Sequence, residues 1–133
     1  MLYCMEKGKV HLLPGLFKER SEVNRGYLLD LELQGLLQNF YLEAGIVMPD
    51  LQVLENPETA KLHWSWEAPT CQLRGHFLGH FMSAAAKLTA YEQDYELKAK
   101  LDKIVDELEK CQQLNGGQWL GSCNISNSGS AFK

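Results

Sequence analysis

The chain has 133 residues, 45% of them hydrophobic and 23% charged, a balance typical of one globular domain and not of a disordered segment. Its net charge of -4 gives no basic surface for nucleic acid, and no apolar run is long enough to span a membrane. The four cysteines form no CxxC pair, and the N-terminus lacks the pattern of a signal peptide. We therefore expect a cytoplasmic protein that binds neither nucleic acid nor membrane.

The first part of the chain is predicted to hold a short extended piece and two helices. Residues 8–15 read as the extended piece and end in a Pro-Gly turn. Apolar residues then recur at helical spacing over 16–31 and over about 33–44, and Gly45 is the expected terminator of the second helix.

A long connection over 45–70 follows, interrupted by three prolines. Connections of this length are uncommon inside compact domains, and those that occur are often functional. This one carries Trp64 and Trp66, which favours a functional role.

The segment 71–91 is predicted to be the most buried helix, because it is apolar or small nearly all round and lacks a charged face. Large apolar residues fill one sector of its helical wheel, and glycine, serine and alanine fill another. Its polar exceptions share one row, at i, i+4, i+7 and i+11: His76, His80, Ser83 and Lys87.

The next segment, 95–114, is predicted to be an amphipathic helix with one apolar stripe and one charged face. Asp94 is the expected N-cap, and Asn115-Gly116-Gly117 is the expected stop. A buried helix followed, after a short turn, by an antiparallel solvent-facing helix is the repeating unit of a helical barrel. The sequence therefore predicts an all-α fold, part of a helical barrel or toroid with inner and outer helix pairs joined by one long loop.

The residues of chemical interest gather where the long loop enters the helix 71–91. Aromatic rings can stack on the carbons of a sugar, while carboxylates, imidazoles and guanidinium groups bond its hydroxyls. Trp66, Glu67, His76 and His80 are therefore the candidate substrate-binding residues. Arg74, near a helix start, is not a favourable partner of the helix dipole, so a carboxylate or ligand partner is expected for it.

Other interpretations of these residues remain open. His76 and His80 could form half a metal site, with Cys71 and Glu67 completing the shell, but the glutamate of an HExxH motif is missing. They could also be core histidines with satisfied hydrogen bonds. The tryptophans could anchor the loop by burial and leave Glu67 exposed.

Several segments resemble the opening of the β-L-arabinofuranosidase family of glycoside hydrolases. The most specific is Leu73-Arg-Gly-His-Phe-Leu-Gly-His80, and the resemblance runs in order from about Gly8 to Ser122. Further matching segments are Pro14-Gly-Leu-Phe-Lys-Glu-Arg20, Leu36-Leu-Gln-Asn-Phe40, Trp66-Glu67 and Asn115-Gly-Gly117.

This resemblance implies an (α/α)6 barrel that cleaves L-arabinofuranosyl or related linkages of plant glycans. It also implies that the chain is an N-terminal fragment, because family members are several times longer. Their acid/base glutamate and zinc-bound cysteine nucleophile lie downstream, and no residue here matches either. No catalytic residue, metal ligand or cofactor is therefore assigned to this chain, although zinc is possible in the full-length enzyme.

The expected division is a barrel segment over 1–122 and a divergent polar tail over 123–133. A partial barrel would leave apolar surface uncovered, so self-association is possible. Carbohydrate is the expected partner, and activity of the chain alone is not expected. The alternative is a small helical binding or scaffold protein with a structural or weakly metal-binding histidine pair.

Overall fold

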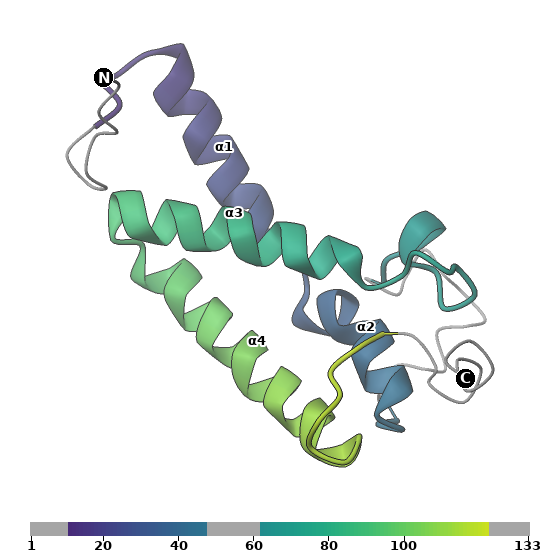
Figure 1. Cartoon of the computed structure of the whole chain (residues 1–133). Helices are drawn as coiled ribbons and strands as arrows, with labels where there is room; N and C mark the ends of the chain where they lie inside the picture. The colour runs from purple at the N-terminus through teal and green to yellow at the C-terminus, as the bar shows by residue number, and fades with distance from the viewer. Residues whose placement is uncertain (1–10, 48–61, 123–133) are drawn as a thin grey trace, which may run out of the picture.

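The computed structural model describes residues 11–47 and 62–122, and within these ranges the chain is all-helical, with no strand (Figure 1). The elements are α1 (Leu16–Asp30), α2 (Leu33–Glu43), the 3-10 turn η2 (Ser65–Glu67), α3 (His76–Glu92) and α4 (Tyr95–Leu114). The predicted all-α class is confirmed. None of these helices is long and apolar enough to cross a membrane.

Some predictions fall outside the described residues. The extended piece over 8–15 is described only from residue 11, and the middle of the connection 45–70 and the tail 123–133 are not described.

Two helices end at the glycines that the sequence indicates. After α2, Gly45 adopts a φ of 70°, and the amide of Ile46 donates to the carbonyl of Tyr41 at 2.9 Å. After α4, Gly116 adopts a φ of 88°, and the amide of Gly117 donates to the carbonyl of Gln112 at 2.8 Å. Both are Schellman arrangements, in which a left-handed residue lets the chain satisfy the last carbonyls.

The start of α4 is capped as predicted and is also tied to α1. The carboxylate of Asp94 accepts from the amides of Glu96 and Leu97 at 3.2 and 3.1 Å. The same carboxylate pairs with the guanidinium of Arg25, which also reaches Glu96 at 2.8 Å. The hydrogen bond from Arg25 lowers the pKa of Asp94 below its ordinary value.

Lys100 supplies a second tie between α4 and α1. Its ammonium donates to the carbonyls of Leu28 and Leu29 at 2.8 Å each and to that of Leu31. A cation is favourable at these carbonyls because they carry the negative end of the α1 dipole. Burial lowers the pKa of Lys100, and its nitrogen lies 5.4 Å from the centre of the Phe81 ring.

The core lies where α2, α3 and α4 meet. The predicted two-faced character of α4 is confirmed, because most of its apolar stripe is buried or partly buried and most of its charged residues are exposed. Val105 is the exception, since it lies on the predicted stripe but is half exposed. The buried cluster consists of Leu28, Leu36, Leu37, Tyr41, Leu78, Phe81, Ala85, Leu97, Ile104, Leu108 and Cys111.

The prediction that 71–91 is the most buried helix is wrong for this chain. Helix α3 begins only at His76, and its polar row and most of its small residues face solvent. Helix α2 has the larger buried share, because it packs against both α3 and α4 and uses polar side chains to hold the long loop. The exposed side of α3 has no covering helix within the described residues.

Helices α3 and α4 form a hairpin around the turn at Gln93 and Asp94 and run in broadly opposite directions, as predicted (Figure 1). Helix α1 lies beside the C-terminal half of α3. Helix α2 lies below α3 in Figure 1 and packs against α4. This arrangement is consistent with part of a helical barrel. The barrel itself does not close within the described ranges.

Helix α1 carries uncovered apolar side chains. Leu16, Phe17 and Val23 are each exposed over more than half of their surface. Such side chains are available to a second molecule, so self-association stays a prediction.

The double role of Asp94 generates a stability prediction. Asp94→Ala removes the cap and the Arg25 pair, and should lower the free energy of unfolding by about 0.5–2 kcal/mol. Asp94→Asn keeps a capping oxygen and should cost less. Because the folded pKa is lowered, the contribution of the charge is complete above the ordinary value of 3.8 and is lost as the pH falls through the folded pKa.

Chemical denaturation of the variants across pH 2 to 7 would measure these differences. Asp106→Asn, at an exposed position of the same helix, is the matched control and should be nearly neutral. A difference between wild type and Asp94→Asn that grows as the pH falls below 3.8 would contradict the sign of the effect.

Candidate functional site

A pocket of about 400 Å³ lies between the loop around η2, the start of α3 and Tyr27 of α1, and it is open to solvent. Its wall is largely aromatic, and Trp66 is 64% exposed, so a flat apolar ring faces water beside the opening. Polar groups come from Ser65, Glu67 and two histidines. The described residues that line it are Tyr27, His63, Trp64, Ser65, Trp66, Glu67, His76 and Phe77.

Glu67 is the buried acid of this site, with a side chain only 12% exposed. Its oxygen Oε2 accepts from the amide of Gly75 at 2.5 Å, and Oε1 accepts from the amide of Phe77 at 2.9 Å. The first amides of a helix have no partner inside the helix, so the carboxylate satisfies donors that would otherwise be free. Glu67 thus caps α3 from across the loop, where the helix dipole favours a negative charge.

Two buried polar side chains of α2 hold the loop from below. The amide of Gln38 donates to the carbonyls of His63 and Glu67 at 2.6 and 2.9 Å, and its oxygen accepts from the amide of His63 at 2.8 Å. Asn39 donates to the carbonyl of Glu67 at 2.8 Å and to its Oε2 at 3.2 Å. The loop backbone is therefore fixed at both ends of the segment 63–67.

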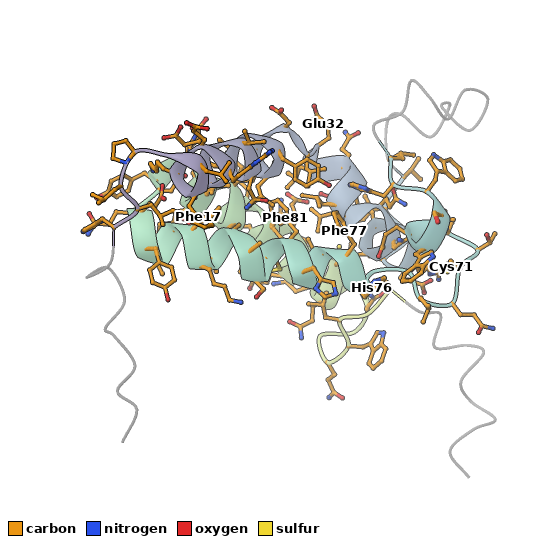
Figure 2. The ribbon with its side chains drawn as sticks, turned by 90° about the horizontal axis from the view of Figure 1, so that it is seen from above. Phe17, Glu32, Cys71, His76, Phe77 and Phe81 are labelled. Carbon is orange, nitrogen blue, oxygen red and sulfur yellow. The ribbon has the colours of Figure 1, made fainter. Side chains whose placement is uncertain are left out.

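His76 is the first residue of α3 and stands at the wall of the pocket. Its Nδ1 lies 2.7 Å from the carbonyl oxygen of Leu73 and 3.2 Å from Oε1 of Glu67. The centre of the Trp66 ring lies 6.1 Å from the centre of the His76 ring. The His80 ring meets the His76 ring edge to face, with 5.6 Å between their centres. Figure 2 shows His76 at the loop end of α3, while Phe77 and Phe81 lie on the side toward α1 and α2.

The turn into α3 is built around Gly75 and Arg74. Gly75 has a φ of 88°, and a Cβ there would lie 2.0 Å from the hydroxyl of Ser122. That hydroxyl donates to the carbonyl of Arg74 at 2.6 Å. The Arg74 guanidinium pairs with Glu43 and bonds the carbonyls of Pro69 and Ser122, so the carboxylate partner expected for Arg74 is confirmed.

His63 forms the inner wall. Its ring packs against Phe77 at 5.1 Å, centre to centre, and burial lowers its pKa. The neutral ring is the favoured form, because a charge would lose its hydration in this position. Its buried Nε2 has no hydrogen-bond partner in the described part of the chain.

The structure brings Trp66, Glu67 and His76 together in one pocket, as the sequence predicts, and places His80 beside His76 but outside the lining. Neither His76 nor His80 is buried, so they are not core histidines. Trp64 and Trp66 are exposed, and Glu67 is buried. This is the opposite of the alternative interpretation, in which the tryptophans are buried anchors and Glu67 is exposed.

Sequence reasoning missed several contributors, among them Tyr27, Gln38, Asn39 and His63. The signal for the α2 pair is that this helix has no charged residue before Glu43, and a helix without a charged face is normally buried. His63 directly precedes Trp64, so it belongs to the same aromatic cluster in the sequence.

The metal interpretation requires at least three ligand side chains close together. The described residues contain no such group of histidine, cysteine, aspartate and glutamate.

Fold and site together define an all-α protein with an open, aromatic-walled pocket at a capped helix start. The model of the family described as beta-L-arabinofuranosidase, GH127 catalytic domain, matches residues 9–131. The chain belongs to this glycoside hydrolase family.

The match continues past Ser122 into the segment expected to be a divergent tail, and the division into 1–122 and 123–133 stays a prediction. Searches of curated proteins and of solved structures find no match.

Two glycines of the segment 73–80 test this account of the turn. Gly75→Ala should destabilise the fold by about 1–3 kcal/mol, because alanine is strained at this φ and its methyl group would meet Ser122. Gly79→Ala, in the exposed part of α3 with nothing within 4 Å, should stabilise by about 0.5–1 kcal/mol. Thermal unfolding of both variants gives the comparison, and equal effects would contradict the assigned turn.

Proposed function

We propose that this pocket binds an L-arabinofuranosyl or related sugar unit of a plant glycan and forms part of the sugar-binding cleft of a glycoside hydrolase. Trp66 and His76 are its contacting residues, His80 lies at its edge, and Glu67 lies beneath His76. Two observations support this function: the chain belongs to a glycoside hydrolase family, and its pocket has an aromatic wall with polar groups beside it.

The observation that carries the proposal is the exposure of Trp66. A tryptophan that only anchors a loop buries its ring, because that burial is its contribution to stability. Here the ring is 64% exposed at the mouth of a pocket whose polar groups are held in place. An apolar face beside fixed hydrogen-bonding groups matches a sugar, which has apolar C–H faces and hydroxyls around its rim.

We further propose that the chain alone binds and does not cleave. Retaining glycosidases need an acid/base group and a nucleophile on opposite sides of the scissile bond. Among the lining residues that the structure describes, Glu67 is the one carboxylate, and both of its oxygens already accept backbone hydrogen bonds.

Binding of methyl β-L-arabinofuranoside, measured by saturation-transfer NMR and calorimetry, tests the function. Trp66→Ala or His76→Ala should weaken binding by about 2- to 12-fold, the equivalent of one lost contact of 0.5–1.5 kcal/mol. Trp119→Ala removes a partly exposed tryptophan outside the pocket and is the matched control. Equal weakening by all three variants, or binding that none of them alters, would contradict the proposal.

A further inference from the structure

We infer that Glu67 is a positioning residue and not a sugar ligand: with the carbonyl of Leu73, it fixes the proton of His76 on Nδ1. Nε2 of the neutral ring is then a hydrogen-bond acceptor for a ligand hydroxyl. The assignment of the proton stands on the contacts alone, and the ligand statement rests on the proposed sugar-binding function.

The position of the proton follows from the two neighbours of Nδ1. The carbonyl oxygen of Leu73, at 2.7 Å, can only accept a hydrogen bond, and the Glu67 oxygen, at 3.2 Å, accepts when ionised. A bare nitrogen between two acceptors would be repelled by both. Nδ1 must therefore carry the hydrogen, and in the neutral imidazole the other nitrogen then has a free lone pair.

Glu67 suits this role because it is itself held in place. Its two oxygens accept from the amides of Gly75 and Phe77, and Asn39 donates to Oε2. These donors leave Oε1 beside His76 with no freedom to rotate away. Since the side chain is 12% exposed and these partners occupy both oxygens, a sugar hydroxyl would have to displace one of them to bind Glu67 directly.

Of the two side chains, the His76 imidazole is the one that a ligand can reach. The His76 side chain is 44% exposed and lines the pocket, whereas Nε2 has no hydrogen-bond partner within 11–47 and 62–122. Trp66 lies against the same ring. A ligand stacked on Trp66 would meet an acceptor at His76, so the geometry selects a ligand that offers a hydroxyl donor at this point.

The first experiment needs no ligand. Long-range proton–nitrogen NMR of the whole chain, labelled with ¹⁵N-histidine and held at pH 8.5, distinguishes protonated from bare ring nitrogens. We expect Nδ1 of His76 to be protonated and Nε2 to be bare. The opposite tautomer in the wild type would overturn the inference, whether or not the protein binds sugar.

The second experiment tests the action of Glu67 through His76. In Glu67→Ala the Nδ1–H fraction of His76 should fall, and Glu67→Gln provides a milder variant of similar size if alanine disturbs the fold. Glu109→Ala, an exposed carboxylate on α4, is the control and should leave the tautomer unchanged. An unchanged tautomer in folded Glu67→Gln and Glu67→Ala would assign the effect to Leu73 alone and overturn the role of Glu67.

Sugar affinity then separates positioning from direct contact. Glu67→Gln, which keeps an acceptor oxygen for the amides of α3, should weaken binding of methyl β-L-arabinofuranoside by about 2- to 12-fold when His76 is present and have little further effect in His76→Ala. Independent, multiplying losses would show that Glu67 contacts the sugar itself and would overturn the inference. Absence of sugar binding with the expected tautomer would refute the proposed function and the ligand statement together, while leaving the proton assignment in place.

Discussion

The carboxylate of Glu67 accepts from the amides of Gly75 and Phe77, and this contact joins the long loop to the first turn of α3. Both groups are costly to bury alone: the amides begin a helix and have no internal partner, and the carboxylate would lose its hydration. Their pairing removes both costs at once. The pocket depends on it, because the loop carries Trp66 while the helix carries His76.

The rest of the described chain supports this contact. Gln38 and Asn39 hold the backbone on either side of η2, and their helix α2 is itself fixed by packing against α3 and α4. Gly75 lets the chain turn in a left-handed conformation while Ser122 approaches closely. A rigid scaffold of this kind keeps the aromatic ring exposed, where burial would otherwise be favourable, and that is the expected organisation of a binding site.

Local signals predicted the helices well, because their causes are local. Asp94 caps α4 through its own neighbours, and Gly45 and Gly116 end helices through their own φ angles. The burial of 71–91 was predicted wrongly, since burial depends on which neighbours are present. The composition of the site was predicted in part: residue types identified Trp66, Glu67 and His76, but the capping by Glu67 joins residues ten apart through a loop whose path no periodicity encodes.

Amide hydrogen exchange at Phe77 tests the central contact most directly. Amides in the first turn of a helix normally exchange fast, because they have no intrahelical acceptor. The account predicts that the Phe77 amide is protected in the wild type and loses this protection in Glu67→Ala, while the amide of Phe81, one turn further along α3, keeps its own. A Phe77 amide that exchanges as fast as an unstructured peptide in the wild type would contradict the account.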